Sequence, residues 1–83
     1  MKNKFKLAGI TWIVKEQTLA ECGFTDPNTA TIALNSKLPP QSMEVTFYHE
    51  LVHAIMFTMG EQVHDERFVE GFAQLLYQYD QQK

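Results

Sequence analysis

Residues 45–57 read Val45-Thr46-Phe47-Tyr48-His49-Glu50-Leu51-Val52-His53-Ala54-Ile55-Met56-Phe57, a stretch that contains no proline or glycine. Such a stretch favours an α-helix, in which residues four apart lie one turn above each other on the same face. His49 and His53 have this spacing, so the two imidazoles can bind a single Zn2+ ion. Glu50 can then act as general base for a water on that ion. The alternative is that these three side chains lie on an ordinary solvated helix face.

The flanking residues predict where this helix begins and ends. Ser42 is the expected N-cap, and Glu44 falls in the first turn, where the helix dipole favours a negative charge. The helix is expected to run to about Met59 and to stop at Gly60, because glycine suits the left-handed cap. Its apolar positions recur at helical spacing and predict a core-facing stripe: Val45, Tyr48, Val52, Ile55, Met56 and Met59.

A second helix is expected from Glu66 to about Tyr79. Asp65 is its candidate N-cap, and residues 80–83 are expected to form a frayed end. Gly71 costs stability in a helix interior, which suggests close approach by a neighbour. The apolar residues predicted to share one face of this helix are Phe68, Val69, Phe72, Leu75, Leu76 and Tyr79.

The first half of the chain reads as strands and turns. Phe5 to Lys15 is rich in β-branched and aromatic residues and predicts a strand, with Gly9 as a bulge or bend. Residues 18–22 predict a helical turn or loop, and residues 23–28 have turn chemistry. Thr29 to Leu34 predicts a second strand, antiparallel to the first and with a free edge. The expected fold class is α+β, with a short antiparallel β-sheet packed on the two helices.

Composition restricts the class of protein. Eighty-three residues predict a single domain, 1–83, with a thin core. The net charge of −3 and the lack of a basic run argue against nucleic acid as a ligand. Cys22 is the only cysteine, which excludes an internal disulfide and a zinc site built from cysteines. No apolar window has the length of a membrane span or resembles a signal peptide, so a cytoplasmic location is expected.

A catalytic zinc site needs a third protein ligand beside the two histidines. The downstream candidates are His64, Asp65, Glu66, Glu70 and Asp80. Glu66 and Glu70 share a stripe that borders the apolar face of the second helix, so both can point into the interface between the helices. Asp80 lies at the expected frayed end and is the weakest candidate, and spacing alone neither selects nor rejects His64 and Asp65.

The two motifs resemble those of known zinc peptidases. His49-Glu50-Leu51-Val52-His53 followed by Glu70-Gly71-Phe72-Ala73 is similar to the gluzincin arrangement, in which a glutamate on the following helix is the third ligand. The small size and the order of elements more closely resemble the ImmA/IrrE-type metallopeptidases of bacteria, phages and mobile elements, over roughly residues 29–77. The family's usual Gly or Ala before the second histidine is Val52 here, and these 83 residues are not expected to include the DNA-binding or sensor domain that often accompanies such proteases.

The resemblance implies a minimal zincin-like fold and a zinc-dependent peptidase that acts on a peptide or protein substrate. It implies His49, His53 and Glu70 as zinc ligands and Glu50 as general base, with Glu66 the next choice for the third ligand. His64 and Tyr77 are candidates for stabilising the oxyanion of the transition state. The alternative is a binding or regulatory module that zinc stabilises and that cleaves nothing.

Overall fold

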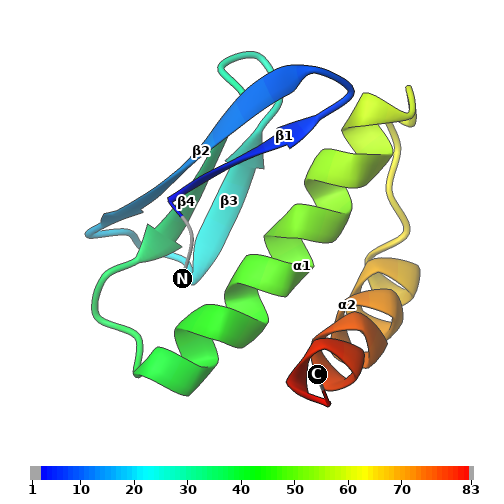
Figure 1. The fold of residues 1–83 in the computed structure, drawn as a ribbon. Coiled ribbons are helices and arrows are strands. Elements are labelled where there is room, and N and C mark those ends of the chain that lie inside the picture. Colours follow the sequence, from blue (N-terminus) through cyan, green and yellow to red (C-terminus); the bar gives the residue numbers. More distant parts are fainter. Residues whose placement is uncertain (1–2, 83) are drawn as a thin grey trace.

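The computed structural model describes residues 3–82, which form a four-stranded sheet and two helices (Figure 1). The expected α+β class is confirmed. The elements in chain order are β1 (Lys4–Leu7), β2 (Ile10–Gln17), β3 (Gly23–Asp26), β4 (Thr31–Asn35), α1 (Pro40–Thr58) and α2 (Glu66–Gln81).

The predicted first strand is in fact a hairpin. β1 and β2 pair antiparallel, with Leu7 opposite Ile10, so that only Ala8 and Gly9 form the loop. Both loop residues have positive φ, 50° at Ala8 and 81° at Gly9. A two-residue hairpin loop with positive φ at both positions matches the right-handed twist of the flanking strands. Gly9 therefore takes part in a full reversal of the chain, and the prediction of a single strand with a bulge or bend at Gly9 was wrong.

The sheet is mixed, with strand order β1-β2-β4-β3. β4 pairs parallel to β2, with Val14 beside Ile32, so the expected antiparallel pairing of these two strands was wrong. The reason is β3, which pairs antiparallel to β4 and was expected to be a turn. Residues 18–22 form neither helix nor strand and lead the chain across to β3. β4 thus lies inside the sheet, and β3 forms the edge.

One face of the sheet packs against α1. Ile32 and Leu34 of β4 are fully buried and cluster with Trp12, Val14 and Ala54 in the main core. α1 begins at Pro40, with Pro39 at the N-cap, and not at the expected Ser42. Proline suits the first helical position because it has no N–H to leave unpaired. Glu44 therefore lies beyond the first turn, whereas Gly60 has the expected positive φ, 91°.

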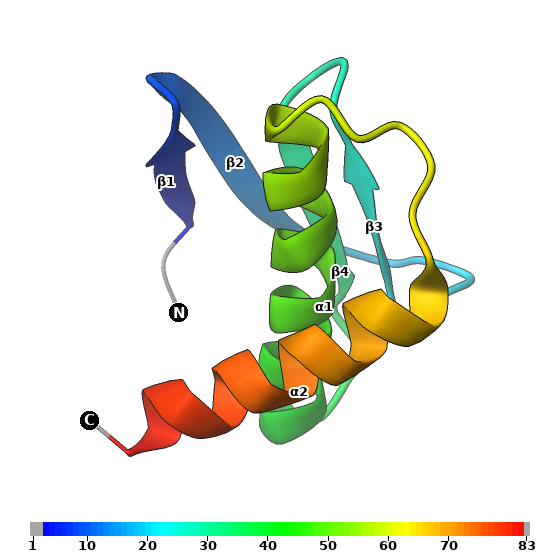
Figure 2. The same cartoon turned by 90° about the vertical axis from the view of Figure 1, so that its right-hand side faces the viewer.

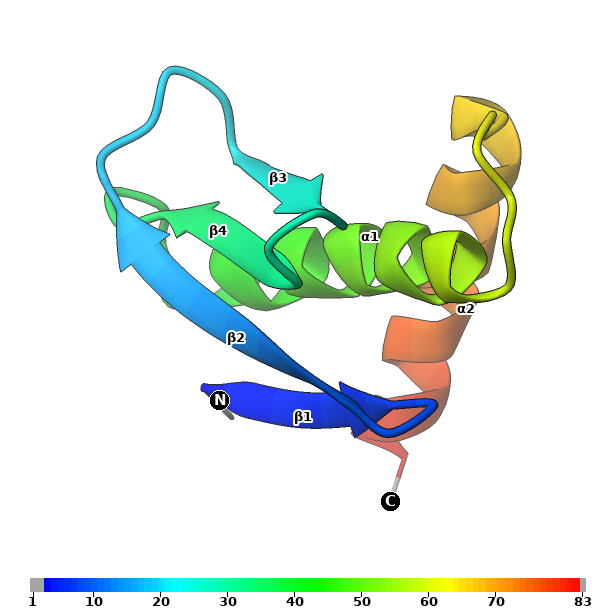
Figure 3. The ribbon, with the colours of Figure 1, turned by 90° about the horizontal axis from the view of Figure 1, so that it is seen from above.

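α2 packs mainly on α1 and crosses it on the side away from the sheet (Figures 2 and 3). Val69 and Ala73 are buried against Val52 of α1. Asp65 caps α2 as expected, its side chain accepting a hydrogen bond from the backbone N–H of Arg67 at 3.0 Å. The helix continues to Gln81, two residues beyond the predicted end.

Most of the predicted apolar face of α2 is exposed. Small side chains at Val69 and Ala73 allow the two helices to approach, so the contact stripe lies to one side of the larger residues. No heavy atom outside the local helix lies within 4 Å of the position that a Cβ would take at Gly71, so the expected close approach there was wrong. The exposed apolar stripe of α2 consists of Phe68, Phe72, Leu75 and Tyr79. Within residues 3–82, neither helix is both long and apolar enough to cross a membrane.

Candidate metal centre

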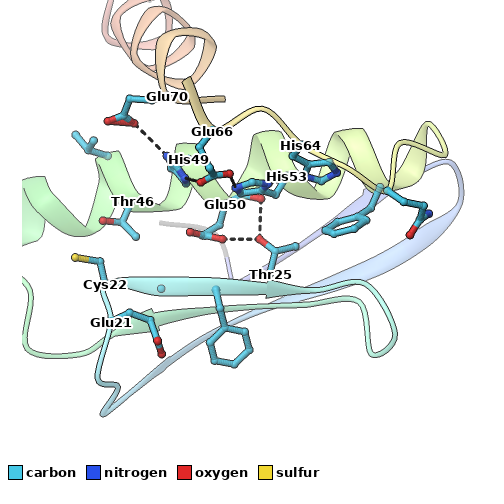
Figure 4. A pocket seen from close by; sticks show the side chains of 15 residues that line it. Glu21, Cys22, Thr25, Thr46, His49, Glu50, His53, His64, Glu66 and Glu70 are labelled. Atoms are coloured by element: carbon cyan, nitrogen blue, oxygen red, sulfur yellow. Dashed lines mark hydrogen bonds and ion pairs between the residues drawn. The ribbon is translucent and has the colours of Figure 1, made fainter. Parts of the chain in front are cut away.

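His49 and His53 lie on the same face of α1 and point toward the first turn of α2 (Figure 4). His49 Nε2 lies 3.4 Å from Glu66 Oε1, and His53 Nε2 lies 3.0 Å from Glu66 Oε2. One ligand atom from each of these three residues lies within 4.8 Å of the others. The Asp65 cap begins α2 at Glu66, which places this carboxylate across from the two imidazoles.

The three side chains fit a zinc ion in both chemistry and spacing. Imidazole nitrogen and carboxylate oxygen are usual zinc ligands, at roughly 2.0–2.2 Å from the ion. Two ligands of one ion therefore lie roughly 3–4 Å apart, and the two histidine–Glu66 distances are in this range. The donor set also matches a catalytic site, in which three protein ligands leave a position for water.

Glu70 is not in this group of three. Its Oε1 lies 3.1 Å from Nδ1 of His49, the ring nitrogen that faces away from Glu66. A carboxylate at that position orients a metal-binding imidazole and raises its basicity. Burial lowers the pKa of His49, but the hydrogen bond to Glu70 and the charge of Glu50, together with Glu66, raise that pKa above its ordinary value.

His64 stands on the other side of His53. Its Nδ1 lies 2.6 Å from His53 Nδ1, and its Nε2 lies 2.7 Å from the backbone carbonyl oxygen of Glu61. The ring also contacts Phe57, at 4.4 Å between ring centroids. Both ring nitrogens of His64 already have partners, so this geometry does not favour His64 as the oxyanion donor.

Glu50 lies between α1 and the sheet edge, and only 8% of its surface is exposed. The Thr25 hydroxyl of β3 lies 2.7 Å from Glu50 Oε1 and 3.0 Å from the Glu50 carbonyl oxygen (Figure 4). A hydroxyl has one proton to donate, and the shorter distance is to the carboxylate, so Thr25 fixes the Glu50 side chain in the cavity that both histidines also line. Sequence reasoning missed Thr25 because Gly23 to Asp26 reads as a turn, with no strand pattern to place its side chain.

Replacement of Thr25 by valine is expected to destabilise the metal-free protein. Valine keeps the shape and suits a strand, but the buried carboxylate of Glu50 loses its donor, which costs about 1–3 kcal/mol. Urea unfolding with a chelator present measures this loss, and Thr25→Ser, which keeps the hydroxyl, is the control. Equal stability of the valine variant and the wild type would show that this hydrogen bond does not stabilise the fold.

A cavity of about 690 Å³ contains the whole group and extends along β3. Its lining includes four carboxylates and three histidines but no Lys or Arg. A cavity lined by several carboxylates and by no basic side chain has a negative potential, which attracts a cation. Gly23 is required at its wall, because a Cβ there would lie 2.7 Å from the Ala33 carbonyl oxygen and 3.0 Å from Thr46.

The remaining candidates lie outside this cavity. Tyr77 packs edge-on against Tyr48, at 5.6 Å between ring centroids, and is not among the residues that line the cavity. Asp80 accepts a hydrogen bond from the Tyr48 hydroxyl, and burial together with Asp80 raises the pKa of Tyr48 to about 12. Asp65 caps α2. The structure thus brings together His49, His53 and Glu66, and it does not bring Tyr77, Asp80 or Asp65 to them.

Comparison with known proteins identifies the family of this chain. No curated protein and no solved structure matches the chain significantly. The family model described as the IrrE N-terminal-like domain, a peptidase family, matches residues 10–76, from the start of β2 to within α2. Because this match covers most of the chain and includes every residue of the candidate metal centre, the protein belongs to the ImmA/IrrE metallopeptidase family.

Proposed function

We propose that this protein is a zinc-dependent peptidase whose metal ligands are His49, His53 and Glu66. The observation that carries the proposal is the convergence of two imidazoles and one carboxylate from two helices, beside the buried carboxylate of Glu50. Glu66 replaces Glu70 as the proposed third ligand because Glu66 faces the Nε2 atoms of both histidines. Within residues 3–82, the polar contact that Glu70 makes is with Nδ1 of His49.

A bound zinc ion lowers the pKa of water toward neutrality and polarises a peptide carbonyl. Side chains of the protein transfer the proton and keep the site in position. Glu50 accepts the proton of the attacking water and passes it to the leaving amine. The Thr25 hydroxyl keeps this carboxylate aimed at the site, and Glu70 keeps the His49 ring oriented.

The edge strand β3 supports an extended peptide as the substrate. Thr29 to Leu34 was expected to offer a free edge, but β4 is paired on both sides. β3 is the edge strand on that side, and its residues 23–25 line the cavity that contains the metal centre. A peptide that adds to such an edge gains backbone hydrogen bonds.

We still expect that the protein does not bind nucleic acid. We also still expect a cytoplasmic location.

The proposal is tested by measuring metal content and peptide hydrolysis on the same purified protein. We expect about one zinc per chain, and release of new amino termini from host proteins that a chelator stops and added zinc restores. A protein that binds zinc but cleaves nothing would favour the second candidate function, a zinc-stabilised binding module. The exposed apolar stripe of α2 is the observation that favours this alternative, because such surfaces often bind partners.

The stabilising effect of zinc is expected to shrink as the pH falls from about 8 to 5. Zinc binds only neutral imidazoles, so protons compete with zinc for His49 and His53 as the pH falls, and the stability that zinc adds is lost. In the metal-free protein the pKa of His49 is raised, so its contribution is present at low pH and is lost as the pH rises. As the pH falls, both effects narrow the difference in melting temperature between the zinc-loaded and the metal-free protein.

Scanning calorimetry with and without chelator, at several pH values, measures this difference. Because protons and zinc compete for the same imidazoles, the melting temperatures should converge near pH 5. A chelator that leaves the melting temperature unchanged at pH 7.5 would show that the fold is not coupled to a metal.

A further inference from the structure

A chain of contacts leads from the metal centre to a backbone carbonyl. His53 Nδ1 lies 2.6 Å from His64 Nδ1, and the planes of the two rings differ by 17°. His64 Nε2 then lies 2.7 Å from the Glu61 carbonyl oxygen. The N–H bonds and lone pairs of imidazole lie in the ring plane, so near-parallel rings allow a direct hydrogen bond between the two Nδ1 atoms.

The Glu61 carbonyl oxygen determines which nitrogen of His64, and then which nitrogen of His53, carries a proton. A backbone carbonyl only accepts, so His64 must bear its proton on Nε2. A neutral imidazole has one donor and one acceptor, which leaves His64 Nδ1 as an acceptor. His53 must therefore donate from Nδ1. The remaining nitrogen of His53, Nε2, then presents its lone pair toward the Glu66 carboxylate, 3.0 Å away. Two lone pairs at that distance repel each other unless a metal ion or a proton lies between them.

We propose that His64 is a positioning residue that holds His53 in the Nδ1–H form, with Nε2 directed at the metal site. The role as a positioning residue rests on the proposed metal centre, but the placement of the protons does not. His49 has the corresponding arrangement through Glu70, whose carboxylate faces Nδ1 of that ring. His64 differs from Glu70 because it is a neutral ring. The Glu61 carbonyl oxygen fixes the proton of His64 on Nε2, and this leaves Nδ1 to accept a hydrogen bond from His53.

Long-range 1H–15N spectroscopy of the histidine side chains reads the proton positions directly. We expect His64 to carry its proton on Nε2, and His53 to keep a proton on Nδ1, in the metal-free and the zinc-loaded protein near pH 8. A proton on His64 Nδ1, or a His53 ring protonated on Nε2 alone, would overturn the proposal. The metal-free spectrum decides the proton positions even in a protein that binds no zinc, so failure of the proposed function is a separate result.

Two variants of His64 test the consequence for the metal. His64→Phe keeps the aromatic contact with Phe57 but removes the acceptor, and we expect zinc affinity to fall roughly 10- to 100-fold. His64→Asn offers a carbonyl oxygen near the position of Nδ1 and should restore most of that loss. Competition with a chromogenic chelator measures the affinities. Wild-type affinity in the phenylalanine variant, or an equal loss in both variants, would contradict the positioning role.

Discussion

Glu66→Ala is expected to abolish stoichiometric zinc binding. The Glu66 carboxylate is the one that faces Nε2 of both His49 and His53, so its removal leaves a site with two ligands. The side chain is exposed and alanine is the best helix former, so α2 should remain folded. Elemental analysis after gel filtration, together with the far-ultraviolet circular dichroism spectrum, measures the two properties separately.

Glu70→Ala is the matched control for this prediction. Both glutamates are exposed, both lie on α2 and both contact His49. Because Glu70 contacts only Nδ1, its loss should lower zinc affinity roughly 10- to 100-fold and still allow full occupancy at excess zinc. If Glu70→Ala lost the metal while Glu66→Ala kept it, the third ligand would be Glu70, as the resemblance to gluzincins implies.

Local chemistry made both helices predictable, but pairing in the sheet depends on distant residues. The helical spacing of His49 and His53, the Asp65 cap and the Gly60 stop act within one or two turns, and each holds in the structure. β3 is only four residues long and contains Gly23 and Asp26, which are typical of turns. It becomes a strand because β4 pairs with it, and this extra strand is what leaves β2 and β4 parallel.

The third ligand could not be chosen from sequence for a related reason. Glu66 and Glu70 are four residues apart, so they lie on the same side of any helix. What separates them is how α2 lies across α1, and this depends on the burial of Val69 and Ala73. The predicted apolar face of α2 included Val69, but most of its larger residues (Phe68, Phe72, Leu75 and Tyr79) remain exposed.

Glu50→Gln is expected to lower the rate of peptide hydrolysis at least about a hundredfold while zinc binding and stability are kept. An amide cannot accept the proton of the attacking water, and general-base catalysis contributes roughly 10²–10⁴ in rate. The amide oxygen of glutamine can still accept the hydrogen bond from Thr25, so the buried side chain keeps its partner. Initial rates of amine release, measured at equal zinc content, compare the variant with the wild type.

A rate loss in Glu50→Gln has a second explanation, because the change also removes one negative charge from the cavity. Glu21→Gln separates the two explanations, since Glu21 lines the same cavity but has no contact with the histidines in the described structure. If hydrolysis depends on Glu50 as a base, Glu21→Gln should keep a rate close to that of the wild type. Equal losses in both variants would assign the effect to cavity charge, and unchanged hydrolysis in Glu50→Gln would rule out Glu50 as the base.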